Sequence, residues 1–189
     1  MSYVKLKDIS SIHFALLEKS TTGEIVKTVS PVGLLENNVI EIKEENVKIK
    51  KNDIVLKQND IIIKRISPNY VNVLDRYEEE LLLFNNALAI RIIDDNYISE
   101  YVAHSIEQQL PHLLSEADSG TFFTAINRKL LEEINIVVID KDEQIKIGHL
   151  WRLGNKKQIL LKQLLRKEQE RLKAINKKLQ SKVGGDENG

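Results

Sequence analysis

The stretch that decides the fold is residues 142–183, DEQIKIGHLWRLGNKKQILLKQLLRKEQERLKAINKKLQSKV. Its apolar residues recur at spacings of four and three, which is the heptad pattern of a helix that packs along one face. The stripe runs through Ile147, Trp151, Leu161, Leu165, Leu172, Ile175 and Leu179, with Gly154, Gln158 and Glu168 at the intervening positions. We therefore predict one helix over residues 142–183, stopped by two glycines and followed by a flexible tail at 184–189.

A helix of this length cannot bury its whole stripe against one domain. At 1.5 Å per residue it extends about 60 Å. We expect it to form a coiled-coil homodimer or to dock on a partner, with dimerisation through Trp151, Leu161, Leu165, Leu172, Ile175 and Leu179. The alternative of a solvated surface helix stays open.

Charge divides the chain at the same place. The formal net charge is zero, but residues 1–151 carry 17 positive and 24 negative side chains, whereas residues 152–182 carry 11 positive and 2 negative ones. The first part is therefore acidic and the helix is basic. This asymmetry favours an electrostatic partner for the helix, although a solvated helix face also explains it.

The part before the helix is β-rich. Short runs of branched residues are separated by polar breaks, and they predict strands at 25–29, 39–42, 47–49, 54–56, 61–66, 71–74 and 81–93, the last interrupted at 85–86. Helical spacing predicts a helix within 96–114 and a short one at 126–131, before a strand at 134–139. The expected fold class is α+β: a small, irregular β-rich domain with a few helices over residues 1–141, followed by the long C-terminal helix.

Composition and motifs argue against an enzyme. The chain has no cysteine, and its four histidines lack metal-ligand spacing, so we expect no metal and no cofactor. Residues 67–70 (SPNY) approach the tetrapeptide with which amino-methyltransferases hold a flipped base, but asparagine replaces the second proline. Residues 41–43 (EIK) match only the end of a nuclease metal site, and no phosphate-binding loop or nucleophile elbow is present. With no signal peptide or apolar run of about 18 residues, we expect a soluble, cytoplasmic protein without membrane contact.

Several short segments carry a family resemblance. Residues 4–9 (VKLKDI) are similar to a "KLGDI" opening, and residues 49–56 (IKKNDIVL) with 63–67 (IKRIS) resemble an "L-K-x-G-D-I-L" strand and the Lys-Arg segment after it. Residues 119–121 (SGT) with the apolar positions that follow resemble a "G-S-T…L…L…I" close; those positions are Ile126, Leu130, Leu131, Ile134 and Val137. Together these segments resemble the specificity subunits of type I restriction-modification systems.

The sequence departs from the family pattern in several places. Asn52 stands where the family has glycine, the Lys64-Arg65 segment lacks the glycine that follows it in the family, and the prolines that usually precede the long helix are missing. A standard specificity subunit carries two target-recognition domains and two helices, whereas this chain has one of each. The resemblance thus implies a half-length form, with a target-recognition domain at 1–141 and a helix at 142–183.

The family implies that the domain reads one half of a bipartite site in double-stranded DNA. Lys64 and Arg65 are the best candidates for base reading, because an arginine fork matches guanine O6 and N7. Hydroxyl, amide and guanidinium side chains in the same loop and in the later turn are expected to contact bases or phosphates: Ser67, Asn69, Tyr70, Asn72, Ser119, Thr121, Thr124, Asn127 and Arg128.

The family also implies that the helix spaces two domains and docks methyltransferase and restriction subunits. A two-fold homodimer would prefer a site with inverted-repeat halves. The competing hypothesis is a coiled-coil interaction or regulatory protein without sequence specificity of its own.

Overall fold

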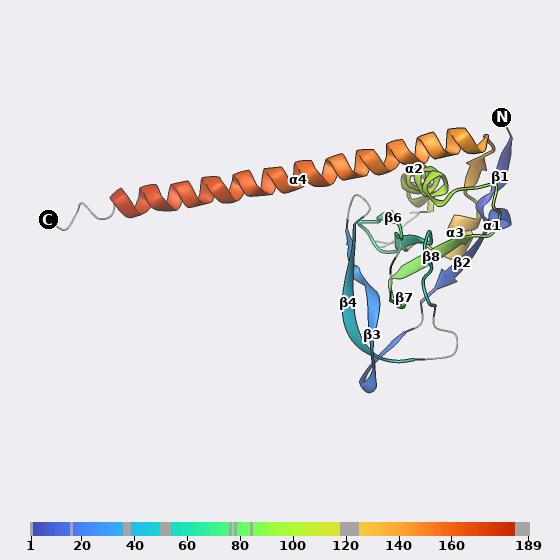
Figure 1. Ribbon diagram of the computed structural model, residues 1–189, viewed down its shortest axis with the longest axis horizontal. Helices are drawn as coiled ribbons and strands as arrows, with labels where there is room; N and C mark the ends of the chain where they lie inside the picture. Colours follow the sequence, from blue (N-terminus) through green and yellow to red (C-terminus); the bar gives the residue numbers. More distant parts are fainter. Residues whose placement is uncertain are drawn as a thin grey trace.

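The computed structural model describes residues 2–15, 17–35, 39–49, 54–75, 77, 79–83, 85–117 and 125–183. It has a β-rich domain from which one long helix projects (Figure 1). The strands are β1 (Tyr3–Lys5), β2 (Ser10–Phe14), β3 (Glu18–Leu35), β4 (Val39–Lys48), β5 (Ile61–Lys64), β6 (Val71–Val73), β7 (Leu81–Leu83), β8 (Ala87–Ile92) and β9 (Asn135–Val137). The helices are α1 (Leu6–Ile9), α2 (Ser99–Ala117), α3 (Arg128–Glu132) and α4 (Lys141–Val183). The predicted α+β class, with a long C-terminal helix, is confirmed.

The strands of the described residues form three sheets. Their orders are β1-β9, β2-β8-β5-β6 and β4-β3-β7, and only the β3–β7 pairing is parallel. Strands β3 and β4 form a long two-stranded arm that reaches well below the rest of the domain in Figure 1. Register shifts interrupt this arm at two places, between Lys19 and Glu24 and between Val29 and Leu34.

The four-stranded sheet β2-β8-β5-β6, the central sheet, is buried on both faces, which explains the unbroken apolar runs of β5 and β8. Successive side chains of a strand point to opposite faces. On one face Ile61, Ile63 and Leu88 pack with α2, whereas Ile62 and Ala89 pack on the other face with residues of β3 and β7. Because both faces are covered, β5 and the first four residues of β8 show no alternation of apolar and polar residues.

The first three turns of α4 pack against α2. Gly148 lies at the closest approach, where an added Cβ would stand 2.7 Å from Glu100 Cβ. Gln144 is 1% exposed; its Oε1 accepts from Ile98 N at 3.1 Å, and its Nε2 donates to Asn96 O at 2.9 Å. From 156 to 180 every side chain except that of Ile159 is exposed. The helix therefore has an anchored root and a long free segment.

Several predictions of local structure needed correction. The strands predicted at 39–42 and 47–49 are one strand, β4, and the strand predicted at 54–56 is reduced to an isolated bridge between Val55 and Leu82. The strand predicted at 25–29 is part of β3, which is far longer because it pairs along β4 through polar residues that show no strand pattern. The first fourteen residues, for which no element was predicted, form β1, α1 and β2. Within the described ranges, no helix is long and apolar enough to span a bilayer.

Candidate nucleic-acid interface

Two segments that the sequence singled out converge in space. Arg65 follows β5, and Ile126 precedes α3. Ile126 N donates to Arg65 O at 3.0 Å, and Arg65 Nε donates back to Ile126 O at 3.0 Å. These reciprocal hydrogen bonds hold the Lys64–Tyr70 loop beside the N-terminal end of α3.

An aromatic ring lies at the point of convergence. The guanidinium carbons of Arg65 and Arg128 stand 5.0 Å and 5.4 Å from the ring centroid of Phe14, a residue of β2. Arg128 Nη2 also donates to Ile12 O at 2.7 Å, and its Nη1 lies 4.0 Å from Glu132. We call Phe14, Arg65 and Arg128 the arginine–phenylalanine cluster. Guanidinium groups held over a ring keep their planes fixed, an arrangement suited to phosphate oxygens and to base edges.

The loop that leads to the cluster is closed by an asparagine. Asn69 Nδ2 donates to Lys64 O and to Arg65 O, each at 3.0 Å. Lys64 Nζ stands 5.3 Å above the ring centroid of Tyr70, and Ser67 is exposed at the turn. The loop thus presents Ser67 to solvent and uses the amide of Asn69 to keep its own shape.

The remaining predicted DNA contacts divide into three groups. Asn72 is 0% exposed, and neither amide atom has a hydrogen-bond partner among the described residues, so a base cannot reach it in this structure and its assignment needs correction. Asn127 caps α3, with Oδ1 accepting from Leu130 N at 2.9 Å. Ser119, Thr121 and Thr124 lie outside the described residues.

Sequence reasoning missed Phe14, because a single aromatic residue in a strand gives no pattern. It also missed Arg91, whose guanidinium is bidentate to the buried Asp60 at 2.8 and 2.7 Å. The hydrogen bond with Asp60 raises the pKa of Arg91 against the opposing effect of burial. Nearby, His13 Nε2 lies 2.9 Å from Ser11 Oγ, and burial followed by the charge of Arg91 lowers the pKa of His13.

Among the predicted dimerisation residues, Trp151 is the exception. It is 6% exposed in the core with α2, and its Nε1 donates to Glu107 Oε2 at 2.7 Å. The heptad spacing was right, but at this position α2 covers the stripe, so Trp151 belongs to the root and not to a free dimer face. The other predicted residues are exposed: Leu161 (54%), Leu165 (60%), Leu172 (58%), Ile175 (42%) and Leu179 (56%).

Arg152 makes a further polar contact of the root, in addition to that of Lys141, whose Nζ donates to Asp95 O at 2.9 Å. Arg152 Nη1 donates to Asp75 Oδ1 at 2.7 Å, and its Nε and Nη2 donate to Glu100 Oε1 at 3.1 and 2.8 Å. Burial by itself would lower the pKa of Arg152, but these hydrogen bonds outweigh it and the pKa is raised. In the part of the chain that the structure describes, no group of three or more His, Asp or Glu residues could hold a metal ion.

The fold and the site define a β-rich domain with a cationic, aromatic-backed loop face and a projecting amphipathic helix. No protein-family model and no curated protein matches the sequence. Solved structures from type I restriction-modification systems, two of them of S subunits, do match most of the chain.

One such chain belongs to a structure of the type I R-M system that addresses its assembly and conformational transition. It is 17% identical, with a TM-score of 0.67, and the match covers 92% of this chain and 43% of that one. The HsdS subunit of Thermoanaerobacter tengcongensis is 16% identical, with a TM-score of 0.58 and coverages of 86% and 39%. The S subunit of M. genitalium is 16% identical, with a TM-score of 0.53 and coverages of 94% and 44%. This chain has their fold and spans about two fifths of their length.

Proposed function

We propose that this chain acts as a non-catalytic, half-length specificity subunit of a type I restriction-modification system. It reads one half of a bipartite site in double-stranded DNA. The observation that carries the proposal is the match of the domain and helix together, over 92% of the chain, to a chain of a type I R-M complex.

The proposed reading face comprises the arginine–phenylalanine cluster and the loop before it. Lys64 and Arg65 remain the candidates for base reading, with Ser67, Asn69, Tyr70, Ser119, Thr121, Thr124, Asn127 and Arg128 as further base or phosphate contacts. Asn72 is left out because it is buried. Arg65 uses its Nε to hold Ile126, so DNA would meet the outer nitrogens of a guanidinium whose plane is already set.

The proposed role of α4 is to join two copies and to dock other subunits. Its free segment carries the exposed leucine stripe, and residues 152–182 are strongly basic. Two-fold pairing would give two identical reading faces and a preference for inverted-repeat half-sites. Because residues 1–151 are acidic, DNA binding by the chain alone is expected to be weak. A methyltransferase partner would supply further basic side chains around the DNA.

Selection from a randomised duplex pool tests the reading role, with the chain alone and with a co-expressed methyltransferase. Arg128→Ala should cost about 1–3 kcal/mol on the enriched site if Arg128 reads a base, or weaken all sequences equally if it binds phosphate. Lys129→Ala is the matched control, since it removes the same charge from the next residue of α3. Thermal melting of both variants checks that the loss of the Ile12 contact has not unfolded the domain.

The rival function is a coiled-coil interaction protein without sequence preference. The acidic balance of residues 1–151 favours it, because DNA affinity draws heavily on phosphate contacts. Failure to enrich any sequence, with and without the methyltransferase, would support this rival against the specificity role.

A further inference from the structure

The free segment of α4 acts as a lever, because a small rotation at the root produces a large displacement at its far end. Residues 156–183 extend about 42 Å at 1.5 Å per residue, past the last anchored position, Asn155. A rotation of about 10° at the root would therefore move the tip by about 7 Å, which equals about two base pairs at 3.4 Å per pair. Figure 1 shows how far the helix runs beyond the domain. The direction in which α4 leaves its domain therefore decides where that domain lies relative to a second copy or another subunit bound near the end of the helix.

The anchoring contacts of the root lie along α2 and along the segment just before it, where Gln144 and Lys141 bind residues 95–98. Gly148 approaches Glu100, and Trp151 reaches Glu107, both on α2. A row of contacts to one helix restrains sliding better than it restrains swinging about that helix. A contact with an element away from α2 and the segment before it restrains that swing more effectively.

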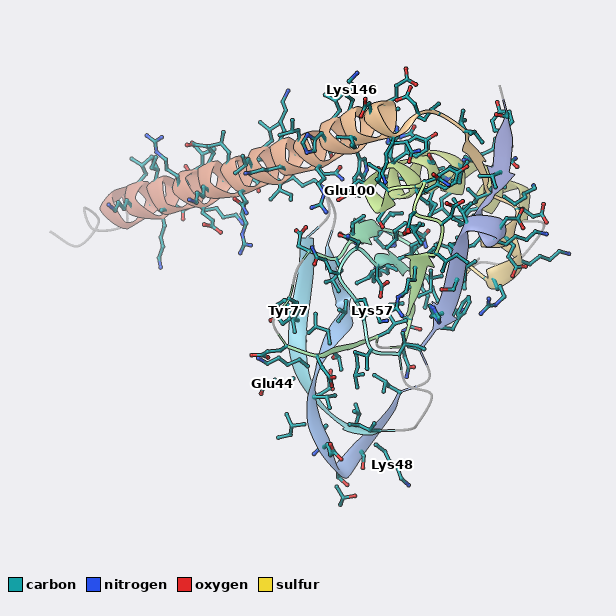
Figure 2. All side chains as sticks on the ribbon, turned by 45° about the vertical axis from the view of Figure 1, so that its right-hand side comes forward. Glu44, Lys48, Lys57, Tyr77, Glu100 and Lys146 are labelled. Atoms are coloured by element: carbon teal, nitrogen blue, oxygen red, sulfur yellow. The ribbon has the colours of Figure 1, made fainter. Side chains whose placement is uncertain are left out.

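Arg152 makes such a contact, with Asp75 after β6. Figure 2 shows Glu100 on α2, below the root of α4. The Arg152 guanidinium binds Glu100 and also Asp75, which lies just beyond the end of β6. All three of its nitrogens donate, and the planar fork gives these hydrogen bonds fixed directions. The Arg152 and Glu100 side chains are only 27% and 24% exposed, so water screens this contact less than a surface ion pair.

We call the hydrogen bonds of Arg152 with Glu100 and Asp75 the clamp. Through Asp75, the clamp contacts the part of the domain that carries the proposed reading face. Strand β6 is the return strand of the Lys64–Tyr70 loop, since it pairs with β5 from Ile61 to Ile63. The same guanidinium thus connects α4 both to α2 and to the strand pair that carries the proposed reading loop.

We propose that Arg152 is a positioning residue that fixes the direction of α4 relative to the domain and thereby sets the spacing between the two half-sites. The spacing role rests on the proposed function, whereas the direction of the helix does not. Arg152 touches no DNA and acts through the orientation of the domain.

Distance measurement between spin labels tests the direction of the helix. The chain has no native cysteine, so cysteines introduced at Lys129 on α3 and Lys177 on the free segment can be labelled cleanly. Labelled protein is diluted into unlabelled protein so that each measured pair lies within one chain. Arg152→Met keeps the apolar stem and removes the fork, and we expect it to shift or broaden the distance distribution by about 5 Å, from a lever of about 33 Å and a swing of about 10°.

Two further variants sharpen this measurement. Arg166→Met is the matched control, because Arg166 pairs with Glu170 within the free segment, at 3.1 Å. Asp75→Asn should give a smaller change in the same direction, since it weakens one arm of the clamp at a side chain that is 76% exposed and tolerant of substitution. If Arg152→Met fails to fold, which thermal melting reports, Asp75→Asn still tests the proposal.

A second arm measures spacing directly, with duplexes in which two copies of the enriched half-site are separated in single base-pair steps. The unsubstituted protein and Arg166→Met should prefer one spacing about tenfold over spacings two base pairs away. Arg152→Met should reduce that preference to about threefold or less and leave the half-site sequence unchanged.

The outcomes separate the two hypotheses. Unchanged distance distributions in Arg152→Met and Asp75→Asn overturn the proposal. A broadened distribution with an unchanged spacing preference also overturns the spacing role. A broadened distribution in a protein that enriches no DNA sequence supports the control of helix direction by Arg152 and refutes the proposed function.

Discussion

Alanine at both Leu161 and Leu172 should break the homodimer that we propose. The two side chains are 54% and 58% exposed in the single chain, so pairing would bury about half of each. Full burial of a leucine contributes about 1.5–3 kcal/mol, which makes the newly buried part worth about 1 kcal/mol per side chain. Two positions in two copies lose about 4 kcal/mol, a weakening of about a thousandfold in the dimer dissociation constant.

The matched control replaces Leu153 and Leu160 with alanine. These leucines are 63% and 56% exposed, but each lies off the heptad seam, with Leu160 about 100° around the helix from Leu161. The control loses the same number of methyl groups and should keep the dimer. Helix content by circular dichroism should be equal in both variants.

Sedimentation equilibrium over a wide range of protein concentration gives the dissociation constants. Dimerisation through the seam is refuted if both double variants weaken the dimer equally, because the seam would then have no special role. It is refuted equally if the unsubstituted chain is a monomer at every concentration.

Three further predictions concern the stability of the single chain, each measured by thermal or denaturant unfolding. Gly148→Ala should destabilise by about 1–3 kcal/mol because the new Cβ meets Glu100 Cβ, whereas Gly154→Ala meets nothing within 4 Å and should stabilise by up to about 1 kcal/mol. Trp151→Ala should cost about 3–5 kcal/mol, and a loss below about 1 kcal/mol would contradict its place in the core. Stability should fall as the pH drops below about 6.5, because the lowered pKa of His13 lets the unfolded chain take up the proton first; His13→Gln should flatten this part of the pH dependence, and an unchanged profile would reject the assignment.

The long helix could be predicted almost to the residue. The stripe predicted 142–183, and α4 runs over Lys141–Val183, because apolar spacing reports helix geometry directly. The same spacing cannot tell what covers each part of the stripe. Trp151 and Leu161 fit one heptad pattern, yet α2 buries the first and leaves the second exposed.

The site could be predicted only in outline. The sequence placed Arg65 and Arg128 in candidate segments, and their meeting around Phe14 depends on tertiary pairing across distant parts of the chain. Asn72 shows the opposite failure: a polar residue between two valines suggests an exposed face, but this sheet is covered on both sides. The apolar runs of β5 and β8 indicate burial on both faces, but the three residues of β6 are too few to show it.

The pairing of β1 with β9 has a consequence for how such domains change over evolution. Residues 3–5 lie antiparallel to Asn135–Val137, and the root of α4 follows four residues later. The chain therefore enters and leaves the domain at one place, a property that makes domains tolerant of insertion and exchange. A domain that replaced the segment between these two short strands would also have to supply the contacts that anchor the root of α4, which Glu100 and Glu107 make in this chain.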